Sequence, residues 1–417
     1  MQFVQKYSKK NNNLDKNLLI GFSFLIIVGG ILNTLSNKTY LNDSWTIGEW
    51  LINYQGGFVR RGFLGEGIYL FSNATKISPI FIIWLISISS YYLLIKLTFI
   101  EAKNKISDVF LLSPCIFMAP IIGDFLIRKD SLLLLIFLIS LKLIKSKRIN
   151  LIFLNLLNIA AILIHESFAI YALPIQFIII SQDNEYKKNY CNFFKFIPSL
   201  CFFICCLIFK GDQNQAISIH QSWLNNSFLF PFENLNYEFP LGAINAIGWD
   251  FKQVLKILLE SLIDFKGILW VPLAWLTTTI FLASFFLGDN SGKDFRIKFF
   301  ILSLQFFPFS ILCFSGGDYG RWIFVWIVSS ILIYCTFGKE LKSYKPIQKN
   351  LFRYDLIKEY CFNIEIHKRS KILLAIFAYP HCCWSLFYLP SLLIVPSYSI
   401  LKKFKIFFKS ILCLIIL

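Results

Sequence analysis

The chain has 417 residues, of which 56% are hydrophobic and only 16% are charged, and its formal net charge is +17. A soluble protein would carry about 25% charged residues, so the composition excludes an ordinary soluble enzyme and predicts an integral membrane protein. The basic residues are spread over short segments between apolar runs, which argues against a nucleic-acid-binding surface. The 11 cysteines show no repeated CxxC spacing. We interpret them as small buried hydrophobic residues rather than disulfides or metal ligands.

Apolar runs close to the ~20 residues that cross a bilayer recur along the whole chain. They predict an all-α fold, a polytopic bundle of about 10–13 transmembrane helices in a single membrane domain, residues 1–417, with interfacial helices in the outer loops. The candidate spans are 18–35, 77–98, 107–123, 131–146, 150–165, 167–181, 196–210, 267–288, 297–314, 322–338, 371–380 with its return 384–400, and 404–417. No small-residue cleavage site follows the first run, so we expect no separate signal peptide.

Orientation follows from the distribution of Lys and Arg. An N-terminus in the cytoplasm places most of them on the inner side, as the positive-inside rule requires. The loops 36–76 and 211–266 then face outward, and 338–371 becomes a cytoplasmic loop. The segments that look chemically active all fall on the outer side in this topology, which predicts a single cavity near the outer leaflet.

The segment "GGFVRRGFLG", residues 56–65, places Arg60 and Arg61 between glycines and phenylalanines in the first outer loop. Arginine near lipid is costly unless something compensates its charge. A guanidinium group matches phosphate oxygens in bidentate fashion, so the pair predicts binding of a lipid phosphate or diphosphate. The alternative is that both side chains anchor the loop among lipid head groups.

Two carboxylates precede these arginines in the same loop. Asp43, or Glu49 as the second candidate, could take a proton from an acceptor hydroxyl while that hydroxyl attacks a sugar carbon. Asp43 also suits a helix N-cap in "NDSWTIGEW", and Glu49 also suits a partner for an arginine. Both readings stay open for each residue.

A charged turn, "GDFLIRKD", joins two apolar runs with almost no loop. It contains Asp124, Arg128, Lys129 and Asp130, although a tight hairpin is usually made with Gly, Asn or Ser. The four charges predict an ion-paired cluster that could also hold an anionic oxygen.

Two later turns carry further ionisable residues. In "HES", His165 could donate to a phosphate or shuttle a proton, or it could cap a buried helix end, and Glu166 follows it directly. In "SGGDYGRW", Asp318 and Arg321 have the i, i+3 spacing of a salt bridge on one helix face. The loop 211–266 is polar and aromatic, which suits either the binding of sugar rings or an amphipathic cover on the membrane surface.

The segments "YQGGFVRRGFLGE", "RKD", "HES" and "GDYGRW" together resemble multi-pass membrane proteins of bacterial surface-polysaccharide pathways. By architecture the chain is also similar to the GT-C superfamily of lipid-phosphosugar glycosyltransferases and to O-antigen polymerases. The resemblance implies a location in the bacterial inner (plasma) membrane. It also implies a catalytic acid in the first outer loop, a role that would fall to Asp43.

We therefore expect a membrane glycosyltransferase that moves a sugar from a polyprenyl-phosphate or -diphosphate donor to a lipid-linked glycan at the outer face. Arg60 and Arg61 would bind the phosphate, helped by Arg128, Lys129 and Arg321. The partners would be these two lipid-linked substrates and membrane lipids, with no nucleic acid. No cofactor is expected; the carboxylates are compatible with a divalent metal, but no ligand spacing supports one. The alternatives are a polysaccharide polymerase, a lipid-linked oligosaccharide flippase or transporter, and a scaffolding protein.

Overall fold

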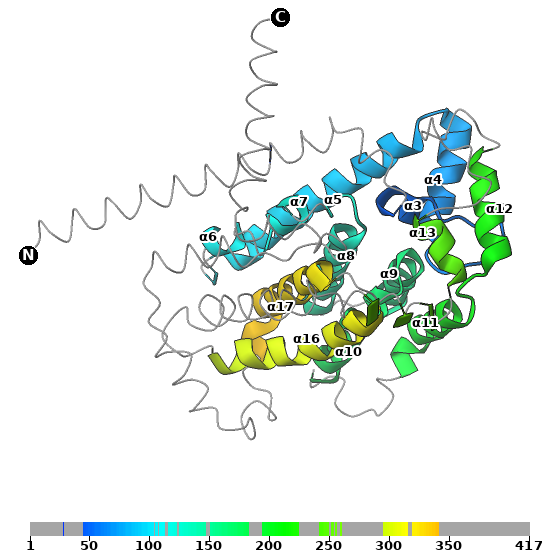
Figure 1. The fold of residues 1–417 in the computed structure, drawn as a ribbon. Coiled ribbons are helices and arrows are strands. Elements are labelled where there is room, and N and C mark those ends of the chain that lie inside the picture. The colour runs from blue at the N-terminus through cyan, green and yellow to red at the C-terminus, as the bar shows by residue number, and fades with distance from the viewer. Residues whose placement is uncertain are drawn as a thin grey trace, which may run out of the picture.

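The computed structural model of the chain is helical throughout the part that it describes (Figure 1). It describes residues 45–103, 105–106, 108–112, 116–122, 125–146, 151–182, 194–224, 242–249, 295–315 and 319–341, with residue 28 and short pieces between 252 and 260. Every regular element in these ranges is a helix, which confirms the all-α class.

The helices fall into a bundle and a cap. The bundle contains α5 (Pro79–Ala102), α8 (Asp130–Lys145), α9 (Leu151–Ile164), α10 (Ser167–Gln182), α11 (Ile197–Ile208) with the preceding turn η2 (Phe194–Phe196), α16 (Phe295–Ser315) and α17 (Tyr319–Leu341). The cap contains α3 (Thr46–Leu51), α4 (Gly62–Thr75), α12 (Gln213–Leu224), α13 (Gly242–Asn245) and the turn η3 (Ala246–Gly248). Two short helices, α6 (Asp108–Leu111) and α7 (Ala119–Ile122), follow α5.

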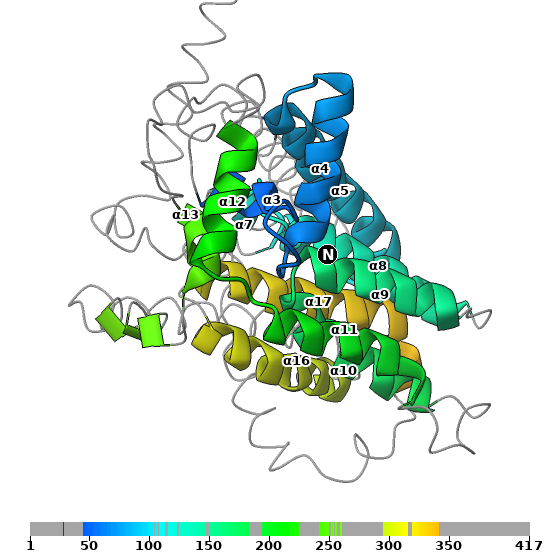
Figure 2. The same cartoon turned by 90° about the vertical axis from the view of Figure 1, so that its right-hand side faces the viewer.

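Helix α17 is the centre of the bundle. Its apolar stretch is 94% buried inside the protein, against 39% for α5 and 50% for α16. It contacts α16, α8 and α5, while α9 lies between α8 and α11 (Figure 2). A helix that is hydrophobic all round and buried on every side, as α17 is, belongs in the core of a bundle.

Several of these helices are long and apolar enough to cross a membrane. They are α5, α16 and α17, and the pair α11 and α12 would add a fourth if this pair, bent by 95°, is one broken span. Helices α9 and α10 are apolar but shorter. The described residues thus support a membrane protein, while the full set of about 10–13 spans stays a prediction.

The helices that the sequence predicts over 77–98, 131–146, 150–165, 167–181, 196–210, 297–314 and 322–338 are confirmed in position. The single helix expected over 107–123 is wrong. Turns at Leu112 and at 116–118 separate α6 from α7, and Pro120 is in the first turn of α7, where a missing N–H does no harm. The expected spans at 18–35, 267–288 and beyond 371 lie outside the described residues.

The cap packs onto one end of the bundle (Figure 2). Trp223 of α12 donates its indole N–H to the carbonyl of Leu51 at 2.8 Å, and Trp50 of α3 donates to the carbonyl of Ile127 at 2.6 Å. A Cβ at Gly65 would lie 1.9 Å from the carbonyl oxygen of Ile52, so only glycine lets α4 approach α3 this closely. The described part of the loop 36–76, residues 45–76, therefore contains two packed helices, α3 and α4, and the turn between them carries Arg60 and Arg61.

Candidate functional site

The turn that carries Arg60 and Arg61 is held in place by its neighbours. The backbone N–H of Arg60 donates to the carbonyl of Phe209 at the end of α11, at 3.0 Å. Arg61 is the N-cap residue of α4 and has a left-handed backbone, with φ of +67°. A left-handed conformation costs a non-glycine residue roughly 1–2 kcal/mol. A Cβ at Gly62 would lie 2.3 Å from the ring of Tyr54, so any other residue at the start of α4 would force this ring to move.

Glu166 joins the two arginines to the start of α10. The Arg61 Nε atom lies 2.9 Å from Oε2 of Glu166, and its Nη2 atom lies 2.5 Å from Oε1. Arg60 Nη1 contacts Oε1 more loosely, at 3.4 Å. The side chains of Arg60 and Arg61 are 24% and 27% exposed, whereas Glu166 is 10% exposed. The two guanidinium groups therefore form the accessible edge of the cluster.

Deeper in the protein, Glu49 of α3 lies between Arg128 and His165. Its Oε2 atom accepts a hydrogen bond from Arg128 Nη1 at 3.0 Å, and its Oε1 atom lies 3.2 Å from His165 Nε2. The Nδ1 atom of His165 accepts the backbone N–H of Ser167 at 3.1 Å. A neutral imidazole must then carry its proton on Nε2, which is directed at Glu49.

Asp130 and Arg321 form a second buried pair, at the starts of α8 and α17. Arg321 donates from Nε to Oδ2 at 2.8 Å and from Nη2 to Oδ1 at 3.1 Å, and the two side chains are 3% and 4% exposed. The guanidinium also lies 5.2 Å from the ring centroid of Trp322. A bidentate pair of this kind fixes α17 against α8 with directional bonds.

Lys129 links the outer edge of the cluster to its interior. Its ammonium donates to the carbonyl of Ile164 at 3.2 Å and to that of Arg61 at 3.4 Å, and lies 5.9 Å from the ring centroid of Trp50. The residue is fully buried. Its partners among the described residues are thus carbonyl dipoles and an aromatic face, which leave its full charge without a carboxylate in contact.

Four helices begin beside this cluster. Arg61 precedes α4, Asp130 opens α8, Glu166 precedes α10, and Arg321 lies in the first turn of α17. Each helix N-terminus carries a partial positive charge and N–H groups that no helical carbonyl accepts. The convergence of these ends reinforces the positive field of the arginines and favours an anion.

The pKa values of the buried groups follow from this field. Burial alone would raise the pKa of Glu49, but His165 and the guanidinium groups of Arg321 and Arg128 hold it well below its usual range. Burial opposes ionisation of Glu166 as well, but Arg61 and other neighbouring positive charges hold its pKa well below normal. Burial and then Arg61 lower the pKa of His165, which keeps the imidazole neutral. Burial lowers the pKa of Lys129 to about 8.

The structure brings most of the residues that the sequence singles out into this one cluster. They are Glu49, Arg60, Arg61, Arg128, Lys129, Asp130, His165, Glu166 and Arg321. Asp43, Asp124 and Asp318 lie outside the described residues. Arg321 forms a bidentate pair with Asp130. The expected pair between Arg321 and Asp318 involves a residue outside the described part of the chain and stays a prediction. Glu49 forms an ion pair with Arg128, which is one of the two roles that the sequence predicts for Glu49.

Two aromatic residues of the site are not evident from the sequence. Trp50 lies beside Lys129, and the ring of Trp322 meets the ring of His165 edge-on, with centroids 6.4 Å apart. Each directly follows a charged residue of the cluster, Glu49 or Arg321, and this adjacency is the signal that could have identified them. Both rings lie against buried cationic side chains, Lys129 and Arg321, and provide a low-dielectric surface there.

Among the described residues, no group of three or more His, Cys, Asp or Glu side chains has an arrangement that could hold a metal ion. Comparison with known proteins adds no relative: no protein-family model, curated protein or solved structure matches the chain. The cluster must therefore be interpreted from its own chemistry.

Proposed function

We propose that the chain is a membrane glycosyltransferase that binds a polyprenyl-phosphate or -diphosphate sugar at the outer face of a bacterial inner membrane and transfers the sugar to a lipid-linked glycan. One observation carries the proposal. Among the described residues, Arg60 and Arg61 share the single carboxylate of Glu166, and no carboxylate contacts the buried Lys129 ammonium. Positive charge that is incompletely paired at a largely buried site calls for an anionic ligand.

The accessible edge suits a phosphate. A guanidinium has five N–H donors, and the Arg60 side chain uses one of them in a single 3.4 Å contact with Glu166. The remaining donors can meet phosphate oxygens, while Glu166 holds the neighbouring Arg61 in a fixed orientation. Lys129 lies directly behind Arg61 and adds a positive charge at the back of the site. The donor phosphate would bind at Arg60 and Arg61, with Lys129 stabilising the charge that develops on the leaving group.

The base that activates the acceptor is best assigned to Asp43. Glu49 is 1% exposed, paired with Arg128 and held ionised with a low pKa, so it is a weak base with little access to a substrate. The His165 lone pair on Nδ1 already accepts the Ser167 N–H. Glu49 and His165 are thus better suited to positioning Arg128 and the start of α10. Asp43, six residues before Glu49, remains the candidate that the resemblance to GT-C enzymes implies.

A polymerase is the nearest alternative, because it would use two diphosphate lipids and two cationic sites. In this chain the two sites would have to be formed by residues 60–61 and by residues 128–129. The Lys129 ammonium, however, donates to the carbonyl of Arg61 itself, which makes both groups part of one site and favours the transferase. A flippase would use the same phosphate site without a base.

The test is glycan profiling of the source cell after deletion of the gene and complementation with full-length variants. Arg60→Gln, Arg61→Gln and Asp43→Asn should each reproduce a deletion glycan that lacks one sugar, at normal protein levels. Lys103→Gln, an exposed cation at the other end of α5, is the matched control and should restore the full glycan. Accumulation of single complete repeat units would identify a polymerase instead. Unchanged glycans in the deletion strain would exclude both enzymatic functions.

A further inference from the structure

A second cationic feature lies at the opposite end of the bundle. A cavity of about 170 Å³ opens where α5, α8 and α17 end. Asp130 and Lys145 bound α8, so this end is ~22 Å from the charged cluster at the helical rise of 1.5 Å per residue. A cavity needs about 10–15 Å³ of such space to hold one water molecule, so this cavity has room for a phosphate group.

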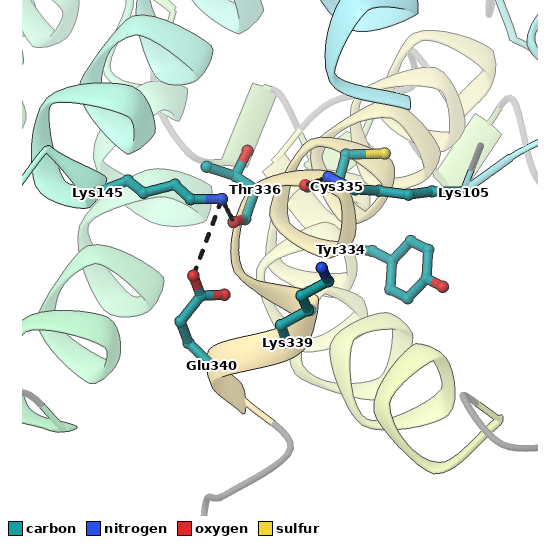
Figure 3. Close-up of a pocket in the computed structure, with 8 residues that line it drawn as sticks. Lys105, Lys145, Tyr334, Cys335, Thr336, Lys339 and Glu340 are labelled. Carbon is teal, nitrogen blue, oxygen red and sulfur yellow. Dashed lines mark hydrogen bonds and ion pairs between the residues drawn. The ribbon is translucent and has the colours of Figure 1, made fainter. Parts of the chain in front are cut away.

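The lining of this cavity is basic. Lys105, Lys145 and Lys339 contribute three positive charges against one negative charge from Glu340 (Figure 3). The Lys145 ammonium donates to the carbonyl of Thr336 at 2.6 Å and lies 3.8 Å from Glu340 Oε1, and the Lys105 ammonium donates to the carbonyl of Cys335. The described residues that line the cavity therefore carry a formal charge of +2.

Helix capping explains only part of this arrangement. Lysines near the C-terminus of a helix neutralise the partial negative charge of its last carbonyls. Lys145 and Lys105 each use one N–H on a carbonyl of α17, and an ammonium has three N–H donors. The remaining donors of Lys145 and Lys105 and all those of Lys339 can turn towards the cavity, which has room for a ligand.

The position of the cavity along the spanning helices indicates the source of this ligand. Both α5 and α17 are long and apolar enough to span a bilayer, and the cavity lies at their C-terminal ends. The end of a spanning helix lies at the level of the lipid head groups. Basic pockets between transmembrane helices at this depth suit anionic head groups. We propose that this lysine pocket binds the phosphate of an anionic phospholipid.

The test measures thermal unfolding of the purified full-length protein in dodecylmaltoside micelles. Phosphatidylglycerol, phosphatidylcholine or inorganic phosphate is added at matched concentrations. We expect phosphatidylglycerol to raise the unfolding temperature by several degrees more than either of the other two, because a ligand that binds only the folded state stabilises it.

The double variant Lys145→Gln, Lys339→Gln should lose this phosphatidylglycerol-specific shift. Glutamine at 145 keeps an N–H for the Thr336 carbonyl, so the variant removes charge rather than the helix contact. Lys142→Gln is the matched control: Lys142 lies one turn before Lys145 on α8 but pairs with Glu101 at 2.9 Å, and this variant should keep the shift.

Two outcomes would overturn the proposal. If the double variant keeps the full shift, the lysine pocket is not the lipid site. If inorganic phosphate alone reproduces the shift in the native protein, the pocket binds free phosphate and the lipid assignment is wrong. Neither result depends on glycan transfer, so the two proposals stand or fall separately.

Discussion

The two ends of α8 and α17 carry similar side chains in opposite surroundings. At one end, Asp130 and Arg321 are 4% and 3% exposed and aligned in bidentate fashion. At the other end, Lys145 and Glu340 are 42% and 50% exposed and their charged atoms are 3.8 Å apart. The same kind of ion pair is therefore shielded from water at the start of these helices and exposed to water at their end.

This difference decides what each pair does. Removing one member of a buried pair leaves the other charge unpaired and out of contact with water, which is strongly unfavourable. An exposed pair is screened by water and contributes little to stability. We infer that the ion pairs of the charged cluster hold the helix starts together, whereas the lysines of the pocket are available to a ligand.

The largest effect should come from breaking the buried pair. Asp130→Asn keeps the shape of the side chain at the start of α8 but removes the carboxylate charge that the Arg321 guanidinium contacts in bidentate fashion. We expect a loss of about 3–5 kcal/mol in the free energy of unfolding, measured by SDS titration in mixed micelles. The double variant Asp130→Asn, Arg321→Met should recover part of this loss, because no charge is then stranded. A loss below about 1 kcal/mol in the single variant would show that water reaches this pair.

An intermediate effect should come from Lys129, through pH. Its pKa in the folded protein, about 8, is below the 10.5 of an ordinary lysine. Between these two values the unfolded chain binds the proton and the folded protein does not, so the stability contributed by this group rises as the pH rises. We expect roughly 1–3 kcal/mol more stability relative to Lys129→Met at pH 10 than at pH 7.

The control for this measurement is Lys103→Met, at an exposed position after α5. The free energy of unfolding of Lys103→Met should differ from that of the native protein by an amount that does not change with pH. Parallel stability curves for the native protein and Lys129→Met would mean that Lys129 is solvated, and the contrast between the two ends would weaken.

The sequence predicts the bundle helices well, because apolar runs that suit lipid also suit a buried core. It fails at 107–123 for a specific reason: average hydropathy hides Pro120, which suits the start of a helix and not its interior. The gathering of charged turns was also predictable, since alternating spans place every second turn on the same side of a membrane.

The pairing of these turns was not predictable. Arg321 pairs with Asp130 across 191 residues of sequence, and Glu49 meets Arg128 across 79. The spacing of residues within one turn says nothing about which turn it will contact. Those contacts depend on the packing of α17 against α8 and of the cap against the bundle, which only the structure shows.

The smallest effect on stability should come from the exposed pair. Glu340→Gln removes the carboxylate beside Lys145, and we expect a change of about 0–1 kcal/mol in the free energy of unfolding, because water already screens both groups. The same variant removes the one negative charge among the described residues that line the lysine pocket. It should therefore increase the shift in unfolding temperature produced by phosphatidylglycerol and leave that produced by phosphatidylcholine unchanged. A large loss of stability would mean that the pair is structural; an unchanged or smaller phosphatidylglycerol shift would mean that charge does not control what the pocket binds. A small change in stability together with a larger phosphatidylglycerol shift would mean that the two ends have different roles. The buried pair stabilises the fold, and the exposed charges control ligand binding.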